Sequence, residues 1–391
     1  MNCDVIIVGG GIHGVGVAQA AAAAGYSCAL LERKNLAWGT SSRSSKLIHG
    51  GLRYLESAQI SVVRECLRER TILLDLAPDL VRLVPFHIPV YRHTRRRPWQ
   101  IRVGLSLYSA LAGPNPGASF ASLPRSEWDD LDGLTTQGLE QVFRYFDAQT
   151  DDARLTRSVM ASARSLGAEL LEGTELLRAD LRDDGVVLAC SQNGRQVEMH
   201  GRVLVNAAGP WVNEVLGRVT PTPRSRPIEW IQGSHLVLDA EVARGAYYLE
   251  ALQDGRAVFV LPWQGKAMIG TTETPFHDDP DKVAVLPAER DYLLRTFESY
   301  FGRRAWETPR ILSEFAGLRV LPAVEGSAFH RSRETVLQTD SPSHPHLLSI
   351  YGGKLTAYRA TAERVMTTLA PSLPACQRRA DTARLPLPSV A

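Results

Sequence analysis

The first 32 residues carry the feature that most restricts how this chain of 391 residues can fold. Residues 4–9 (DVIIVG) form a short apolar run rich in β-branched side chains, which predicts a buried parallel strand. Gly10 and Gly11 end this run, a helix is expected over residues 12–24 up to Gly25, and a second apolar strand over residues 28–31. Strand, turn, helix and strand in this order make one right-handed βαβ unit.

The glycines at the turn of this unit have the spacing GxGxxG, formed by Gly9, Gly11 and Gly14. The first permits a tight turn, the second lets a pyrophosphate approach the backbone, and the third lets the helix pack closely on the strand. Phosphates then lie at the N-terminus of the helix. Glu32 ends the second strand, where an acidic side chain can bind a ribose diol. The pattern predicts a dinucleotide site, with a sharp turn in an unrelated sheet as the alternative.

Two later segments favour FAD over NAD as the dinucleotide. Residues 203–211 (VLVNAAGPW) read as a strand that runs into a turn of small residues, where the backbone can pass close to a cofactor. Residues 352–356 (GGKLT) open the last predicted helix and offer a second helix N-terminus. Three separated sites of close approach suit an extended FAD better than NAD, although an NAD-dependent dehydrogenase stays as an alternative.

The order of the predicted elements indicates two domains that are interleaved in the sequence. Nucleotide-binding segments occur at the beginning, in the middle and near the end, whereas alternating apolar patterns after Ile228 predict antiparallel strands. We therefore expect an α/β (α+β) fold in which a Rossmann-like FAD-binding domain alternates with an antiparallel-sheet substrate domain. The FAD-binding domain is expected to comprise residues 1–85, 140–225 and 315–370, and the substrate domain residues 86–139 and 226–314. The proline-rich residues 371–391 are expected to form a frayed C-terminal tail.

The composition excludes several other classes of protein. Lysine and arginine number 44 against 42 acidic residues, so the net charge of +2 gives no polycation for nucleic acid. The five cysteines are far apart without a CxxC pair, which argues against a disulfide framework or a metal site and favours a reducing, cytoplasmic compartment. No apolar run approaches the length of a membrane span, and the first strand starts too early for a signal peptide.

Longer motifs make a family resemblance visible. The run GTSSRSSKLIHGGLRYLE (residues 39–56) resembles the FAD-dependent, quinone-linked glycerol-3-phosphate dehydrogenases. The resemblance continues in the family's order through FDAQTDDARL (146–155), NAAGPWVNEV (206–215), QGSHLVL (232–238), PW…IGTTET (262–274), GLR (317–319), SRET (332–335) and YGGKLTAYR (351–359). It implies a glutathione-reductase-like FAD domain, a substrate domain that caps the flavin, and oxidation of sn-glycerol 3-phosphate to dihydroxyacetone phosphate with electrons passed to membrane quinone.

The matching motifs also imply which residues form the site. The expected cofactor-binding residues are Gly9, Gly11, Ile12, His13, Gly14, Glu32, Arg33, Thr40, Ser41, Ser42, Ser45, Lys46, Leu47, His49, Gly50, Leu176, Ala207, Ala208, Gly209, Trp211, Gly353, Lys354, Leu355 and Thr356. The expected substrate-binding residues are Arg53, Tyr54, Thr272, Arg319, Arg333 and Lys354, and the expected catalytic residues are His49, Arg53, His235, Arg319 and Lys354.

The chemistry of the implied reaction explains these residue types. Oxidation of a secondary alcohol needs a base for the hydroxyl proton while the flavin accepts hydride, and either His49 or His235 could supply that base. A phosphate monoester needs cations, which Arg53, Arg319 and Arg333 supply as planar forks and Lys354 as a mobile point charge. Ordinary ion pairs with Asp or Glu are the alternative reading of the arginines, and a packed core the alternative reading of the histidines.

Residues 92–111 combine five arginines with Trp99 and several aliphatic side chains. This mixture suits peripheral docking on an anionic bilayer, such as the cytoplasmic face of the inner membrane, which access to membrane quinone would require. A solvated basic loop followed by a core helix explains the same residues equally well.

Three departures from the family pattern leave other functions open. Family members usually continue into a helical C-terminal domain after a segment that resembles residues 382–388, where this sequence stops, as either a short natural variant or a truncation would. His13 stands in place of a common asparagine, and Val320 in place of a common proline. One alternative is a related FAD amine or 2-hydroxyacid oxidase acting on a carboxylate substrate. Another is a flavin-binding protein without turnover, against which the presence of all the expected site residues speaks.

Overall fold

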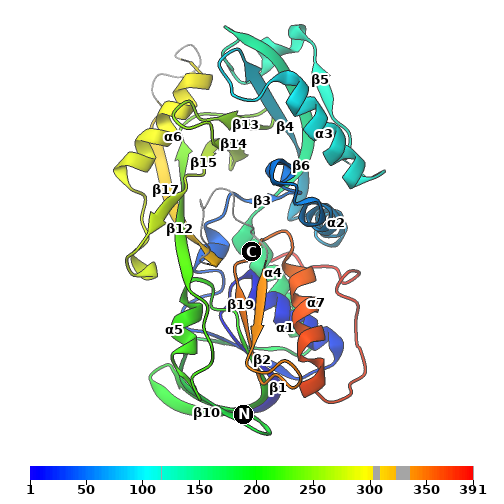
Figure 1. Cartoon of the computed structure of the whole chain (residues 1–391), viewed down its shortest axis with the longest axis vertical. Helices are drawn as coiled ribbons and strands as arrows, with labels where there is room; N and C mark the ends of the chain where they lie inside the picture. Colours follow the sequence, from blue (N-terminus) through cyan, green and yellow to red (C-terminus); the bar gives the residue numbers. More distant parts are fainter. Residues whose placement is uncertain (116, 303–308, 323–334, 391) are drawn as a thin grey trace.

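The computed structural model describes residues 1–115, 117–302, 309–322 and 335–390. Within these residues the chain forms two β-sheets that follow one another along the long axis of the molecule (Figure 1). Helices cover both sheets, so the predicted mixed α/β architecture with two sheets is confirmed.

The first sheet contains the predicted βαβ unit, and in the described part of the chain it has nine strands. Its parallel centre has the order β7-β2-β1-β10-β19, and β8, β9 and the first half of β10 continue it as an antiparallel extension. The strands are β1 (Asn2–Val8), β2 (Cys28–Glu32), β7 (Glu169–Glu172), β8 (Thr174–Arg182), β9 (Gly185–Gln192), β10 (Arg195–Asn206), β11 (Val219–Thr220), β18 (Val336–Thr339) and β19 (Leu347–Tyr351).

Helices α1 (Ile12–Ala24), α4 (Asp152–Ser165) and α7 (Tyr358–Leu369) pack together on one face of this sheet. Alternate side chains of β1 explain why both faces are covered: Val5 and Ile7 enter the core with these helices, whereas Ile6 and Val8 enter a second core that includes α5 (Val212–Leu216). Gly25 ends α1 in a left-handed conformation, as the sequence predicted.

The second sheet has ten strands within the described residues, and most of its neighbours are antiparallel. Its main order is β16-β12-β15-β14-β13-β4-β6-β3, with β17 beside β12 and β5 beside β6. The strands are β3 (Leu47–Ile48), β4 (Val81–Tyr91), β5 (Ala121–Leu123), β6 (Leu139–Thr150), β12 (Ile228–Leu238), β13 (Ala246–Glu250), β14 (Ala257–Trp263), β15 (Lys266–Gly270), β16 (Thr274–Phe276) and β17 (Ile311–Pro322).

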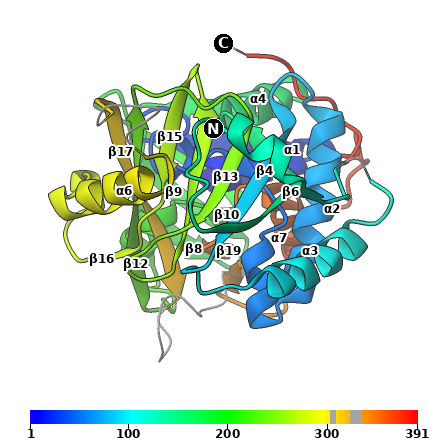
Figure 2. The same ribbon diagram turned by 90° about the horizontal axis from the view of Figure 1, so that it is seen from above.

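Helix α6 (Pro287–Tyr300) lies at one side of the second sheet, and α2 (Ile60–Leu76) and α3 (Pro98–Ala112) lie at the other (Figure 2). Two buried ion pairs fix α2. Arg70 pairs with Asp147 of β6 at 2.6 Å, and Glu69 accepts two bonds from Arg359 of α7 at 2.6 and 2.8 Å. None of the helices in the described ranges is long and apolar enough to cross a membrane.

The sheets draw their strands from alternating parts of the chain, but the expected domain boundaries stay a prediction. Strands β6 and β17 belong to the second sheet, although most of their residues fall in ranges that we assigned to the FAD-binding domain. Both strands lead from the second sheet toward the first, so a boundary placed by composition alone falls within a continuous strand.

The expectation of a frayed C-terminal tail is wrong for the residues described, which extend to Val390. The backbone N–H groups of Arg379 and Ala380 donate to Ala23 O, and Leu387 N donates to Leu76 O at 2.8 Å. Leu387 is buried in the core formed by α1, α4 and α7. Proline lacks a backbone N–H, but its ring and its carbonyl can still contact the surface formed by α1, α2 and α4. We call residues 379–390, which pack on this surface, the C-terminal strap.

We predict that Leu387→Ala lowers the free energy of unfolding by about 2 kcal/mol or more, because it removes a buried side chain from a packed core. Chemical denaturation of the cofactor-loaded protein measures the change, and Arg384→Ala, which truncates an exposed side chain nearby, is the control. Equal stability of both variants and the parent would show that the strap contributes nothing.

Candidate functional site

A cleft of about 400 Å³ lies where the two sheets meet, and residues from both sheets line it. At one end it is bordered by the turn after β1 and the ends of β2 and β10. At the other end it is bordered by β12, β14, β17 and the segment between β15 and β16. The cleft is therefore long enough to present a nucleotide end and a reactive end.

Backbone packing around the glycine turn leaves room for no side chain. A Cβ on Gly14 would lie 1.9 Å from Gly9 O, and a Cβ on Gly9, whose φ is +111°, would lie 2.6 Å from Ala207 O. A Cβ on Gly11 would meet only the Ser41 hydroxyl within 4 Å, so this position stays open toward the cleft. This is the cradle that a pyrophosphate needs at the N-terminus of α1.

Glu32 lies beside this cradle. Its carboxylate accepts hydrogen bonds from Gly10 N and Lys34 N, both at 2.7 Å. The acid is thus held at the edge of the cleft, where the predicted ribose would lie. The residues present fit FAD: glycines approach the pyrophosphate, and an acid is placed for the ribose.

An aromatic and cationic cluster forms the next part of the nucleotide end. Arg33 lies 4.8 Å from the centre of the Trp211 ring, and the rings of Trp211 and Trp38 are 6.0 Å apart. The ammonium group of Lys34 lies 3.3 Å from the Trp38 ring centre. Trp38 lines the cleft but was not among the predicted residues, because an isolated tryptophan before a loop has no distinctive spacing.

Most of the predicted cofactor-binding residues line this cleft. They are Gly9, Gly11, Ile12, His13, Glu32, Arg33, Thr40, Ser41, Ser45, Leu47, His49, Leu176, Ala207, Ala208, Gly209, Trp211, Gly353, Lys354, Leu355 and Thr356. Arg53, Tyr54, His235 and Arg319 line it as well. Arg333 lies outside the described residues.

Gly14, Ser42, Lys46, Gly50 and Thr272 do not line the cleft. Lys46 forms a buried ion pair with Asp152 at 2.5 Å, so its ammonium group is engaged within the protein. Gly50 N bonds to Tyr108 and Asp147, and Thr272 Oγ1 donates to Glu289 at 2.7 Å. These five residues lie outside the cleft lining, whereas Thr271, next to Thr272, is part of it, and the expected roles of all of them stay predictions.

The two candidate bases lie in different environments. His235, on β12, is buried, its ring stacks on Phe315, and its Nε2 is 2.9 Å from Ser45 Oγ. Burial, reinforced by the positive charges of Arg319 and Lys46, lowers the pKa of His235 to about 3. His49 follows β3 and is only partly buried, with its ring edge-on to Phe259. His235 is consequently neutral across the physiological range.

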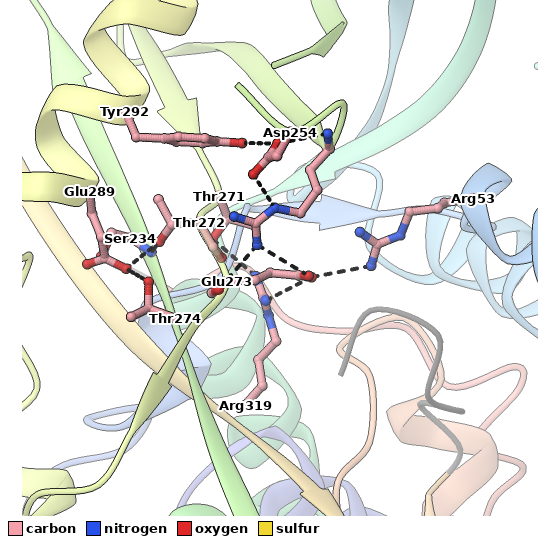
Figure 3. Close-up of polar contacts among 11 residues, drawn as sticks. Arg53, Ser234, Asp254, Thr271, Thr272, Glu273, Thr274, Glu289, Tyr292 and Arg319 are labelled. Atoms are coloured by element: carbon pink, nitrogen blue, oxygen red, sulfur yellow. Dashed lines mark hydrogen bonds and ion pairs between the residues drawn. The ribbon is translucent and has the colours of Figure 1, made fainter. Parts of the chain in front are cut away.

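Three arginines from distant parts of the chain converge at the reactive end. Oε1 of Glu273 lies 3.5 Å from Nη2 of Arg53 and 3.3 Å from Nη1 of Arg319 (Figure 3). Its Oε2 lies 3.9 Å from Nη1 of Arg256. Lys354 adds a fourth cation, with its ammonium group 4.0 Å from the Tyr54 ring centre. Such a concentration of positive charge at the end of a cleft suits a small anionic substrate.

A buried carboxylate holds the strand segments that carry this cluster. Glu289 of α6 accepts from Ser234 Oγ, Thr272 Oγ1, Thr274 Oγ1 and Gln232 Nε2 at 2.5–2.7 Å. Burial acts to raise its pKa, but these hydrogen bonds outweigh burial and bring the pKa below its usual value. Glu289 therefore stays ionised and ties α6 to both β12 and the segment between β15 and β16.

Sequence reasoning missed several residues of the reactive end, namely Tyr145, Tyr248, Arg256, Phe259 and Glu273. The aromatic residues occur in strands, where such side chains are expected in the core. Arg256 precedes β14 without a recognisable pattern. Glu273 lies within the motif IGTTET, so a charge in an otherwise small and polar run was the signal available.

We predict that acidification below about pH 6.5 destabilises the protein through His235 and His87. Burial, together with the charge of Arg144, lowers the pKa of His87 to about 4. Both histidines stay neutral in the folded state, whereas unfolded histidines bind protons below about pH 6.5. Above that pH the two histidines contribute fully to the free energy of unfolding. This contribution is lost as the pH falls toward 4, at up to about 1.4 kcal/mol per pH unit for each histidine.

Urea denaturation at several pH values between about 7 and 5 measures this slope. His87→Gln, which lies away from the cleft, should reduce the slope by the share of one histidine. An unchanged slope in this variant, or a parent protein that gains stability on acidification, would contradict the prediction.

Comparison with known proteins agrees with the geometry. The profile of the family described as FAD dependent oxidoreductase matches residues 4–359. The glycerol-3-phosphate dehydrogenase of Pseudomonas aeruginosa is 39% identical over 393 aligned positions, which cover 98% of this chain and 75% of that protein. The D-erythritol 1-phosphate dehydrogenase of Brucella abortus is 36% identical over 375 positions, which cover 94% of this chain and 74% of that protein.

A solved structure shows the same arrangement. The glycerol-3-phosphate dehydrogenase from Bacillus halodurans, complexed with FAD, superposes with a TM-score of 0.74 at 27% identity, covering 99% of this chain and 68% of that one. The predicted cofactor, FAD, and the predicted family are confirmed. The chain belongs to the FAD dependent oxidoreductases, in the group that includes the glycerol-3-phosphate dehydrogenases.

Proposed function

We propose that this protein oxidises the secondary hydroxyl of a phosphorylated polyol, with sn-glycerol 3-phosphate as the first candidate and dihydroxyacetone phosphate as its product. The observation that carries the proposal is the convergence of Arg53, Arg256 and Arg319, with Lys354 nearby, at one end of a cleft whose other end fits FAD. A phosphate monoester has the charge and the number of oxygens to engage several guanidinium groups. The names of the relatives support a phosphorylated polyol as substrate.

The two relatives differ in the polyol, so D-erythritol 1-phosphate is a second candidate substrate. Both molecules share the phosphate and a neighbouring secondary alcohol and differ in chain length. The residues that would bind the phosphate are therefore the same for both candidates. A carboxylate substrate, as in an amine or 2-hydroxyacid oxidase, would carry one charge where this cluster offers three guanidiniums.

We assign the role of base to His49. A base works best when its pKa lies near the operating pH, and His235 with a pKa of about 3 is too weak an acceptor for a hydroxyl proton. His49 lines the cleft, and its backbone N–H is fixed by Thr356 Oγ1 at 3.1 Å. Bound FAD supplies the hydride acceptor. Arg53 and Arg319 orient the substrate, while neutral His235 positions Ser45 at the cleft wall.

Helix α3 supports the proposal that electrons pass to membrane quinone. Ile101, Leu105 and Tyr108 face the core, whereas Trp99, Val103 and Leu107 on the opposite face are 66%, 60% and 39% exposed. The helix thus has a buried face and an exposed apolar face. Arg96 and Arg97 are in ion pairs, but Arg92 and Arg95, in the segment that leads into the helix, are exposed. Peripheral docking on the cytoplasmic face of the inner membrane would use this surface.

Anaerobic addition of substrate to the FAD-loaded protein tests the reaction. Glycerol 3-phosphate should bleach the visible flavin absorbance, and a soluble quinone should restore it. The rate of bleaching by D-erythritol 1-phosphate, measured in parallel, shows which of the two polyol phosphates is the better substrate. Bleaching by glycerate or an amino acid with none by either phosphate ester would instead identify an oxidase of carboxylate substrates.

Substitution of the two histidines separates their roles. We expect His49→Gln to slow flavin reduction by about 100-fold or more, the usual contribution of a general base, while FAD stays bound. His235→Gln should have a smaller effect on the rate constant of reduction. Stopped-flow reduction at saturating substrate measures both. The assignment fails if His235→Gln abolishes reduction and His49→Gln does not.

A further inference from the structure

The ion pairs around Glu273 are unusually long for arginine and carboxylate groups so well enclosed. Its oxygens lie 3.3, 3.5 and 3.9 Å from the nearest guanidinium nitrogens of Arg319, Arg53 and Arg256. Charge-assisted bonds of this kind normally measure about 2.7–2.9 Å. The buried pairs Arg70–Asp147 and Arg359–Glu69 are 2.6 Å long, and the partly exposed pair Arg290–Glu314 is 2.7 Å long, whereas the other pairs of similar length to those of Glu273 lie at the surface. Three guanidinium groups from separate parts of the chain therefore lie within 3.9 Å of one carboxylate.

The positions of the three arginines are set by other contacts. Arg319 Nη2 donates to Thr271 Oγ1 at 3.0 Å. Arg256 Nε donates to the Asp254 carboxylate at 2.7 Å, and the same carboxylate accepts a hydrogen bond from the Tyr292 hydroxyl. Arg53 comes from a short 3-10 helix, Leu52–Ser57. Separate parts of the fold thus bring three guanidinium groups to one carboxylate in the wall of the cleft. A phosphate monoester has three terminal oxygens and up to two negative charges.

Contacts on either side fix the backbone of Glu273, so any displacement of its carboxylate has to come from rotation about the side-chain bonds. The hydroxyls of Thr272 and Thr274, on either side, both donate to Glu289 Oε1 at 2.7 Å. Figure 3 shows Glu289 with Ser234 and Thr274 at one side and the Glu273 carboxylate directed away from them, toward Arg53 and Arg319. Rotation about the side-chain bonds of Glu273 can therefore withdraw the carboxylate without disturbing the strand segments.

We propose that Glu273 is an internal anion that occupies the phosphate position between Arg53, Arg256 and Arg319, and that the phosphate of the substrate displaces it. This deepens the proposed function and rests on it for the identity of the substrate anion. Before binding, the carboxylate offsets the mutual repulsion of the guanidiniums. Because it is attached to the site, its effective concentration is high, and every external anion must compete with it. Weakly bound anions are thereby kept out, and Arg256 becomes a third phosphate ligand.

Displacement can be distinguished from simple repulsion by a carboxylate that stays in place. A carboxylate that must be displaced lowers the affinity of every anion by the same factor, since the same internal contacts are broken each time. A carboxylate that stays in place lowers the affinity for a dianion more than that for a monoanion, because the Coulomb energy scales with the product of the charges. Inorganic phosphate and acetate, at a pH where phosphate is mainly dianionic, provide the two probes.

The experiment is calorimetric titration of the FAD-loaded protein with inorganic phosphate, and with acetate in competition against phosphate. Glu273→Gln removes the charge, and Glu273→Asp keeps the charge but shortens the side chain so that it spans the three arginines poorly. In Glu273→Gln both anions should bind about tenfold more tightly, equivalent to about 1.4 kcal/mol. In Glu273→Asp phosphate binding should also strengthen, by a smaller factor.

Two results would overturn the proposal. If only Glu273→Gln gains affinity, and gains more for phosphate than for acetate, the carboxylate acts by repulsion from a fixed position. If neither variant binds phosphate more tightly than the parent, the carboxylate does not occupy the anion position. Unchanged FAD content and unfolding temperature show that the variants are folded. The titration needs no turnover, so a failure of glycerol 3-phosphate to bleach the flavin would refute the proposed substrate and leave this measurement informative.

Discussion

The close approach of three backbone segments at the ends of β1 and β10 is the constraint on which the site depends. Gly14 packs on the carbonyl of Gly9, and Gly9 packs on that of Ala207, at distances that exclude any Cβ. This packing turns the N-terminus of α1 toward the cleft and sets β1, β2 and β10 in register. The cradle for the pyrophosphate follows from this contact, and β10 leads on through α5 and β11 to β12, the strand of the second sheet that lines the other end of the cleft.

Local patterns allowed the sequence to predict the parts of the protein formed by neighbouring residues. The βαβ unit, the stop at Gly25 and antiparallel strands after Ile228 all occur as expected. Each of these elements depends on the spacing of apolar residues along the sequence, or on a glycine whose backbone conformation is set by its sequence neighbours. The family resemblance then added Arg53, Arg319 and the two histidines, which no local pattern could have joined.

Contacts between distant segments could not be predicted in the same way. Glu273 and Arg256 belong to one cluster because two strand connections meet at the same edge of the second sheet, and nothing in either segment shows this. The same holds for the two threonines of the motif IGTTET, since the sequence does not show that Thr272 donates to Glu289 on α6 while Thr271 lines the cleft. The C-terminal strap was judged from its prolines, whereas the surface that binds it is built from α1, α2 and α4.

The two buried ion pairs of α2 have a mechanical consequence for how ligands enter. Arg70 joins this helix to the second sheet, while its neighbour Glu69 joins it to α7 on the first sheet. A hinge rotation of one sheet relative to the other would have to separate one of these pairs, and exposing or isolating such a charge typically costs about 3–5 kcal/mol. Within the described residues, the two pairs thus brace the two sheets against opening as a clamshell, and ligands would have to enter the cleft without a rotation of one sheet away from the other.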